Sequence, residues 1–350
     1  MRFSVTRRTA SILVACALVA GCLATAAAAS HSKRSAGRLV GAGSTFVQPL
    51  VSQWQAAYPS LTGVDIVYQP IGSGGGIQAI TNRTVDFGAS DAPLTPDQAT
   101  ACKGCLQIPW ALGGTAVMVN VKTNAHAPLK ITGQVLAAIY LGQVKKWNDP
   151  QIQKLNPGVS LPDTTITPVY RSDGSGTSYN FTDYLSAISP AFKSKVGVST
   201  QPPFPAGVGG RGSSGVAGVV KNTDGAIGYA DIAYAVTNHI PVMAVRNAAG
   251  KYTTPGIKSI TAASVATTKI AANNEMHIAN PPKSAPLAYP ICTYTYVIVP
   301  TNASNGAALK KFVFWALTGG QKYGVKLRYV PIPKHVLIAA EKTLKQVSST

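Results

Sequence analysis

Acidic residues are scarce in this 350-residue chain, which has 12 Asp and Glu against 31 Lys and Arg and a formal net charge of +19. It contains neither HExxH nor GxSxG, the sequences typical of zinc peptidases and of serine hydrolases. It also lacks GxxxxGK[ST], which excludes a nucleotide-binding loop of that kind. We therefore expect a protein that is not an enzyme and that needs no cofactor.

Histidine and cysteine are sparse as well, and this limits the metal chemistry open to the chain. The five histidines stand apart from one another, and a single CxxC, Cys102 to Cys105, occurs, so no metal site is expected. Cys102 and Cys105 are expected to form a local disulfide in a surface loop, with Cys292 buried and reduced. Pairing of Cys292 with either of them is the alternative.

Long apolar runs are missing except near the N-terminus. Arg2, Arg7 and Arg8 precede an apolar run, Ile12–Val19, that is too short to span a bilayer and is followed by small residues. This pattern predicts a signal peptide over residues 1–21 and therefore export from the cytoplasm.

The end of that run resembles the lipobox of bacterial lipoproteins. Val19-Ala20-Gly21-Cys22 implies cleavage before Cys22 and a lipid on that cysteine. The alternative is an ordinary signal peptide cut within Ala24–Ala29. Residues 22–38, rich in Ala, Ser and Gly, then form a flexible tether. We expect a lipid-anchored protein on the extracytoplasmic face of the bacterial cell membrane.

The basic residues are scattered along the chain rather than gathered in a stripe. Cleavage before Cys22 would leave 329 residues and reduce the net charge from +19 to +16. Export removes the protein from nucleic acid, so we expect no nucleic-acid partner. Attraction to an anionic cell surface and steering of an anionic ligand explain the charge.

The segment Arg171-Ser172-Asp173-Gly174-Ser175-Gly176-Thr177-Ser178 is suited to an oxyanion. The helical spacing of Phe181, Tyr184 and Leu185 places it at a helix N-terminus, where free backbone N–H groups attract negative charge. Arg171 adds a planar fork for two oxygens. The alternative is a common Asp/Gly/Ser turn with a helix cap.

Two earlier loops repeat this arrangement. Gly41-Ala42-Gly43-Ser44-Thr45-Phe46 and Ile71-Gly72-Ser73-Gly74-Gly75-Gly76 each precede a run with helical spacing. Between them and the third loop lies Val85-Asp86-Phe87-Gly88-Ala89-Ser90-Asp91-Ala92-Pro93-Leu94. Asp91 stands in an apolar setting, where an idle charge is unusual.

These four segments, in this order, resemble the ligand-contacting segments of the phosphate-binding proteins that serve phosphate-specific ABC transporters. The resemblance runs from about Leu39 to near the C-terminus. It implies a two-lobed α/β periplasmic-binding-protein-like fold of type II, which closes on inorganic phosphate and passes it to membrane permease subunits. By motif position it implies ligand contacts from Thr45, Phe46, Ser73 and Asp91 in one lobe and from Arg171, Ser175, Gly176 and Thr177 in the other.

Two further residues are expected to support this site. Asp173 is expected to orient Arg171 by hydrogen bonding. Ser44 stands where the family commonly has alanine, and it either adds a contact or caps the helix. Gly207–Gly212 is interpreted as a loop, with little expectation that it touches ligand.

Strand-like and helix-like runs alternate along the chain, which favours two parallel-sheet lobes. The strand-like runs are Val64–Tyr68, Ala116–Val121, Ile166–Tyr170 and Tyr294–Val299. Two of these regions, Thr115–Asn120 and Tyr294–Val299, are expected to be crossover strands. Lobe one is then 39–118 plus 294–350, and lobe two is 119–293.

Asp91 suggests how such a site would choose its anion. Phosphate near neutral pH still carries a proton, since phosphate-type second pKa values lie around 6. An ionised Asp91 can accept that proton in a hydrogen bond, but it repels sulfate, which has none to offer. A receptor for arsenate, sulfate or tungstate is the first alternative, and an extracellular phosphatase is the more distant one.

Overall fold

The computed structural model describes residues 37–349, in which strands and helices alternate as the sequence predicts. The first part of this order is β1 (Gly37–Gly43), α1 (Gln48–Thr62), β2 (Val64–Gln69), α2 (Ser73–Thr81), β3 (Phe87–Ser90), α3 (Pro96–Ala101) and β4 (Cys105–Asn120). The proposed tether up to residue 36, together with Cys22, lies outside the described residues.

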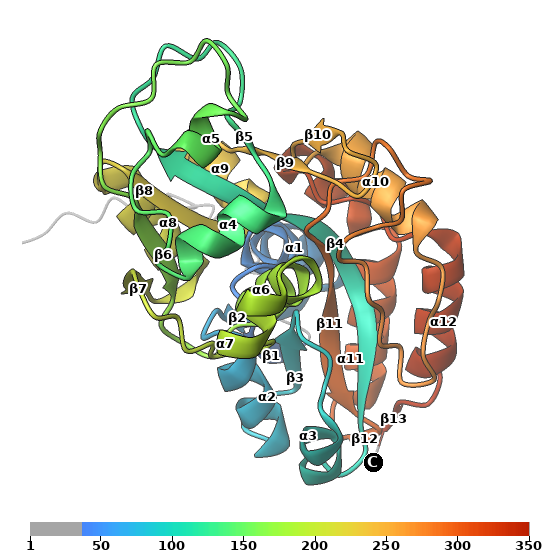
Figure 1. The fold of residues 1–350 in the computed structure, drawn as a ribbon. Coiled ribbons are helices and arrows are strands. Elements are labelled where there is room, and N and C mark those ends of the chain that lie inside the picture. The colour runs from blue at the N-terminus through green and yellow to red at the C-terminus, as the bar shows by residue number, and fades with distance from the viewer. Residues whose placement is uncertain (1–36, 350) are drawn as a thin grey trace, which may run out of the picture. The chain divides into compact units, whose positions relative to one another are not determined.

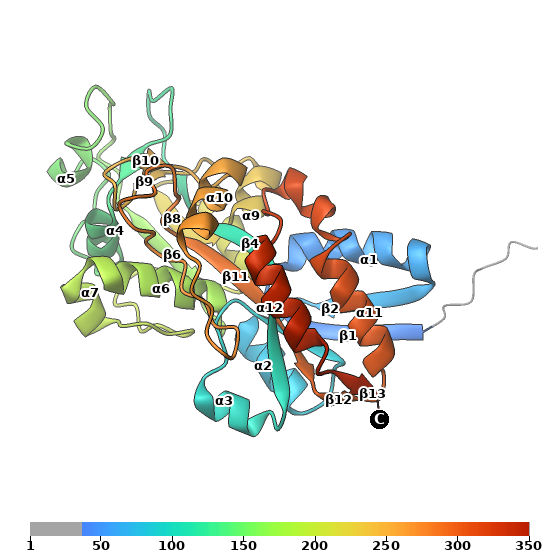
Figure 2. The ribbon, with the colours of Figure 1, turned by 90° about the vertical axis from the view of Figure 1, so that its right-hand side faces the viewer.

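The middle and the end of the chain continue the alternation. The middle contains β5 (Lys130–Ile131), α4 (Gly133–Tyr140), α5 (Pro150–Gln153), β6 (Thr167–Arg171), α6 (Gly176–Ile188), α7 (Pro190–Lys195), β7 (Val208–Gly210), α8 (Gly212–Asn222), β8 (Ala226–Asp231), α9 (Ile232–Asn238), β9 (Ala244–Arg246), β10 (Tyr252–Thr253) and α10 (Ile257–Ala266). The end contains β11 (Cys292–Pro300), β12 (Asn302–Ala303), α11 (Gly306–Leu317), a 3-10 helix (Gln321–Leu327), α12 (Lys334–Leu344) and β13 (Ser348–Ser349). Figure 2 shows α11 and α12 side by side near the C-terminus.

One sheet of eight strands, in the order β2-β1-β3-β11-β4-β8-β6-β7, organises the described residues. Its long strand β4 runs beside β11 (Figure 1). Residues 105–114 of β4 pair with β11, and residues 115–120 pair with β8. We call the strands on the β11 side, with residues 105–114, the first half of the sheet, and those on the β8 side, with residues 115–120, the second half.

Pairing within the two halves is mostly parallel, as predicted, and the exceptions are the two long strands. β1 pairs in parallel with β2 and β3, and β6 pairs in parallel with β7 and β8. β4 is antiparallel to β11 and β8, and β11 is antiparallel to β3. The described pairs of β11 all belong to the first half, so β4 is the strand that carries the chain from one half to the other.

Different groups of aromatic side chains pack against the two halves of the sheet, within one continuous hydrophobic core. Trp54 on α1 packs edge-on against Trp110 on β4 and Phe312 on α11, with ring centroids 5.1 Å and 6.3 Å apart. In the second half, Phe181 on α6 stacks on Tyr229 of β8 at 4.1 Å. These contacts hold α1 and α6, whose N-termini follow two of the predicted binding loops, firmly against the sheet.

Local sequence explains which face of α1 is buried and where the helix ends. Leu50, Val51, Trp54 and Tyr58 keep helical spacing and are all buried. The helix stops at Gly63, whose φ of 75° lies in the left-handed region that glycine adopts without strain. The predicted helical spacing is therefore confirmed. After Gly63 the chain continues directly into β2.

The predicted pairing of the cysteines is confirmed in the described residues. Cys102, which is buried at the end of α3 rather than in a surface loop, forms a disulfide with Cys105, the first residue of β4, and Cys292 is buried with a free thiol. Within residues 37–349, none of the helices combines the length and apolar character that a membrane span requires.

Candidate functional site

The predicted binding residues gather at the carboxyl ends of strands and the N-termini of the helices that follow. Ser44–Phe46 join β1 to α1, Ser73 begins α2 and Asp91 directly follows β3. Arg171 ends β6, and Ser175–Thr177 begin α6. In open α/β sheets ligands bind at this edge, where helix N-termini present free N–H groups. We call these segments together the loop cluster.

The first loop of the cluster is held through its carbonyl groups. The hydroxyl of Tyr68 donates to Ser44 O at 2.8 Å, that of Tyr234 donates to Thr45 O at 2.6 Å, and that of Tyr329 donates to Phe46 O at 2.5 Å. The Ser44 hydroxyl accepts from Phe46 N at 3.0 Å and donates to Asp91. Ser44 therefore orders the loop and also bonds the neighbouring carboxylate.

Asp91 is the buried acid at the centre of the loop cluster, with a relative exposure of 2%. Its Oδ1 accepts from Ser44 and from Thr295 at 3.2 Å, and its Oδ2 accepts from Thr177 at 3.2 Å. A carboxylate can accept about four hydrogen bonds, so Oδ2 retains capacity for one more donor.

Burial raises the pKa of Asp91 to about 6, against the opposing effects of the Ser44 hydrogen bond and the Arg171 charge. Near neutral pH the side chain is therefore mostly ionised. Its Oδ2 can accept a hydrogen bond from a protonated oxygen of the ligand. In mild acid the Asp91 carboxylate is protonated and loses its negative charge.

Arg171 and Asp173 form a compact ion pair on the opposite side of the cluster. Arg171 Nε donates to Asp173 Oδ1 at 2.7 Å, and Arg171 Nη2 donates to Oδ2 at 2.5 Å. Gly212 N also donates to Asp173 at 2.9 Å. Burial would raise the pKa of Asp173, but the hydrogen bonds and charge of Arg171 lower it overall. Asp173 thus fixes the plane of the guanidinium.

Ser175 caps α6 and exposes the start of that helix to the cluster. Its hydroxyl accepts from Ser178 N at 3.1 Å. Gly176 and Thr177 are the first two residues of the helix, whose N–H groups have no acceptor within the helix itself. On the first side, Ser73 is the first residue of α2, which has no side-chain cap, and the Ser73 hydroxyl accepts from Asp91 N at 3.3 Å.

Comparison with known proteins identifies the family. A model of the PBP superfamily domain matches residues 28–319. The phosphate-binding protein PstS of Xylella fastidiosa (strain Temecula1) is 42% identical over 304 residues, which cover 86% of this chain and 83% of the relative. That of Haemophilus influenzae is 37% identical over 306 residues, which cover 86% and 91%. The chain belongs to the PstS family.

Solved structures agree on the fold. The phosphate-bound structure of the periplasmic phosphate-binding protein PfluDING has a TM-score of 0.73 at 21% identity and covers 87% of this chain and 93% of that one. A phosphate-binding protein from Stenotrophomonas maltophilia gives 0.68 at 20% identity, with the same coverage. The two-lobed binding-protein fold predicted for this PstS family member is therefore confirmed.

A fourth loop joins the cluster that the sequence did not single out. Ser213, at the start of α8, donates from its N–H to the Thr45 hydroxyl at 3.0 Å, and the two hydroxyls lie 3.0 Å apart. The interpretation of Gly207–Gly212 as a loop is wrong, because Val208–Gly210 form β7 and α8 begins at Gly212. Gly and Ser residues at the start of this helix repeat the pattern of the other three loops. That repetition was the available signal.

Segments from the two halves of the sheet touch directly across the cluster. Gly74 N donates to Gly174 O at 3.0 Å, and the Asn180 amide donates to Asp91 O at 2.7 Å. Thr177, from the second half, reaches Asp91 of the first. The eight predicted contact residues are thus brought together. In this PstS family member the two halves of the sheet touch at the loop cluster.

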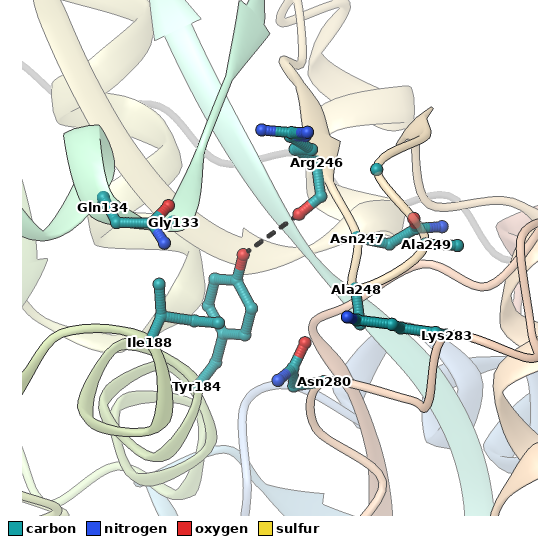
Figure 3. Close-up of a pocket in the computed structure, with 11 residues that line it drawn as sticks. Gly133, Gln134, Tyr184, Ile188, Arg246, Asn247, Ala248, Ala249, Asn280 and Lys283 are labelled. Carbon is teal, nitrogen blue, oxygen red and sulfur yellow. Dashed lines mark hydrogen bonds between the residues drawn. The ribbon is translucent and has the colours of Figure 1, made fainter.

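A hollow elsewhere on the second half does not involve the loop cluster. It has a volume of about 570 Å³ and is lined by residues from the start of α4, the end of α6, the turn after β9 and the segment before β11, including Gly133, Tyr184, Arg246, Asn280 and Lys283. Figure 3 shows the Tyr184 hydroxyl facing the Arg246 carbonyl, at 3.5 Å. None of the predicted phosphate-binding residues lines it. Within residues 37–349 no three His, Cys, Asp or Glu side chains are grouped so that they could hold a metal.

Proposed function

We propose that this chain is an extracytoplasmic receptor that binds inorganic phosphate between two lobes and delivers it to the permease of an ABC-type phosphate importer. The observation that carries the proposal is the convergence on Asp91 of hydroxyl groups from both halves of the sheet, beside the oriented Arg171. Membership of the PstS family, whose named members are phosphate-binding proteins, supports it.

The ligand contacts in this proposal come from both sides of the loop cluster. Hydroxyl and backbone N–H groups would surround the anion, Asp91 would accept its proton, and Arg171 would offer two N–H donors. The proposed set is Thr45, Phe46, Ser73, Asp91, Arg171, Ser175, Gly176 and Thr177, supported by Ser44 and Asp173. Their burial favours strong hydrogen bonds, because little water competes for the donors.

The two lobes in this proposal are residues 39–118 with 294–350, and residues 119–293. They correspond broadly to the two halves of the sheet, between which the pairing of β4 changes after Gly114. Phosphate would be taken up by a hinge motion about this region. Neither lobe alone carries the full set of donors, so tight binding needs both.

The test is a calorimetric titration of the purified protein with phosphate, arsenate, tungstate and sulfate, together with an assay of phosphate-ester hydrolysis on the same sample. We expect tight binding of phosphate, weak or absent binding of sulfate, and no hydrolysis. Preferred binding of another oxyanion would move the assignment to a receptor for that anion. Hydrolysis that exceeds the buffer control would instead support a phosphatase.

We also propose a lipid anchor on Cys22, which lies outside the described residues. The support is the lipobox-like Val19-Ala20-Gly21-Cys22 in the sequence. Cys22→Ser should abolish lipidation and release the protein from the membrane fraction, because no acyl chain would remain to hold it. Mass spectrometry of the mature N-terminus, with Cys16→Ser as the control, checks this. An unmodified wild-type N-terminus downstream of Cys22 would contradict it.

A further inference from the structure

A second buried carboxyl, Asp231, lies behind the first loop of the cluster. Asp231 ends β8 and caps α9, where its Oδ1 accepts from Ala233 N at 2.9 Å. Its exposure is 0%, and no ordinary hydrogen-bond donor among the described residues reaches its Oδ2. An ionised carboxylate in such a position is costly, because the buried charge lacks the donors it had in water.

The groups around Asp231 offer no positive charge. In residues 37–349 it forms no ion pair with Lys, Arg or His. Its pairing partner across β4 is Thr115, whose own buried hydroxyl has no partner among the described groups. The titratable groups that face it are Asp91, Tyr234 and Tyr329, and each of them either carries negative charge or would gain it on ionisation.

Besides Thr115, Tyr329 is a polar side chain that bears on the carboxyl of Asp231. Its hydroxyl would lower the pKa of Asp231 if it donated to the carboxylate. However, the single proton of that hydroxyl is donated to Phe46 O at 2.5 Å. Towards Asp231, Tyr329 can therefore only accept a hydrogen bond. A carboxylate would face a lone pair, whereas a carboxylic acid would donate to it.

Asp231 also supports the second tyrosine that holds the first loop. Tyr234 lies one turn along α9, the helix that Asp231 caps, and its hydroxyl donates to Thr45 O at 2.6 Å. The peptide unit of that carbonyl carries Phe46 N–H, one of the proposed phosphate donors. Asp231 thus stands behind two hydrogen bonds that set the orientation of the first loop.

We propose that Asp231 is a positioning residue of the phosphate site and acts as a neutral carboxylic acid, donating from Oδ2 to the Tyr329 hydroxyl, which in turn donates to Phe46 O. The effect on phosphate rests on the proposed function, whereas the protonation of Asp231 does not. Burial raises the pKa of Asp231 well above its usual range, and the charge of Asp91 adds to this.

The protonation is tested by infrared difference spectroscopy of the ligand-free protein, wild type minus Asp231→Asn, at about pH 8. Asp91, with its pKa of about 6, is ionised there, so Asp91→Asn serves as the matched control. We expect a protonated-carboxyl band in the wild type and in Asp91→Asn that is lost in Asp231→Asn. Absence of the band in wild type, or its survival in Asp231→Asn, would overturn the proposal.

The positioning role is tested by phosphate titration of Asp231→Asn, Asp231→Ala and Tyr329→Phe. Asp231→Ala and Tyr329→Phe should each weaken binding about tenfold, since each breaks the same chain of hydrogen bonds. Asp231→Asn keeps a donor and the helix cap, so its affinity should stay within about threefold of wild type. The double variant Asp231→Ala with Tyr329→Phe should bind phosphate about as well as either of these two single variants.

Each outcome of the titration has a defined meaning. Equal losses in Asp231→Asn and Asp231→Ala, or fully additive losses in the double variant, would contradict the positioning role. Should Asp231→Ala fail to fold, Asp231→Asn and Tyr329→Phe still decide the question. If the wild type does not bind phosphate at all, the proposed function fails, and the infrared band still decides the state of Asp231.

Discussion

The two sides of the loop cluster use aspartate in opposite ways. On the first side, Asp91 is buried among hydroxyl groups, and its pKa is raised to about 6. On the second side, Asp173 is bonded to Arg171 and to Gly212 N, and its pKa is lowered. Of these two side chains, only Asp91 therefore changes its charge near pH 6.

This difference assigns affinity for oxyanions to the second side of the loop cluster and selectivity among them to the first side. Arg171 has a side-chain exposure of 1%, and its charge is largely balanced by Asp173. The second side therefore offers directed donors without a large net charge and should treat tetrahedral oxyanions alike. The first side carries an unpaired negative charge at neutral pH and should reject an anion that brings no proton.

Removing the guanidinium should have the largest effect on this comparison. Arg171→Ala loses a bidentate, charge-assisted contact and should cost about 2–3 kcal/mol, or roughly 30- to 150-fold in phosphate affinity. Any weaker oxyanion should lose affinity by a similar factor. Calorimetry with Arg246→Ala as the control, an arginine of the separate hollow, checks this. A loss confined to one anion would contradict the assigned role.

Neutralising the first side should change selectivity instead. Asp91→Asn keeps an acceptor oxygen for the phosphate proton, so phosphate affinity should fall only modestly, by about 1 kcal/mol. Sulfate binding should appear, because the repelling charge is gone and the amide can donate. Titration of wild type and variant with both anions measures the change in preference. An unchanged preference for phosphate over sulfate would contradict the role of Asp91 in selectivity.

The same residue predicts a pH dependence in the ligand-free protein. Since folding raises the pKa of Asp91 above its unfolded value of about 3.9, its contribution to stability is present below about pH 4 and is lost as the pH rises to about 6. Asp91→Asn should therefore gain stability relative to wild type between about pH 4 and 6, with no further gain above that. Thermal melting at several pH values tests this, and a difference independent of pH would contradict it.

The smallest effect is expected at the fourth loop. Ser213→Ala removes one hydroxyl that bridges to Thr45 across the two halves, at a cost of about 1 kcal/mol or roughly fivefold in phosphate affinity. Ser214→Ala, at the next position, is the matched control. Equal effects from the two variants would show that the bridge contributes nothing specific.

Local pattern alone predicted much of the fold and of the candidate site. Glycine and hydroxyl loops before helical runs marked Ser44–Phe46, Ser73 and Arg171–Thr177, because both signals lie within about ten residues of each other. The role of Ser213 was missed because it depends on Thr45, 168 residues away. Tyr329 bonds Phe46 across 283 residues, and such a contact follows from strand order and helix packing, which local spacing does not encode.

Gly176 sets how closely the two halves of the sheet can approach. A methyl group on its Cα would lie 2.5 Å from Ala92 N and 2.7 Å from Asp91 N, closer than a carbon can come to backbone atoms. One added carbon would therefore push apart the start of α6 and the segment after β3. In the Gly176→Ala variant the two halves could not close fully. All the hydrogen-bond donors would still be present, but they could not surround one anion together.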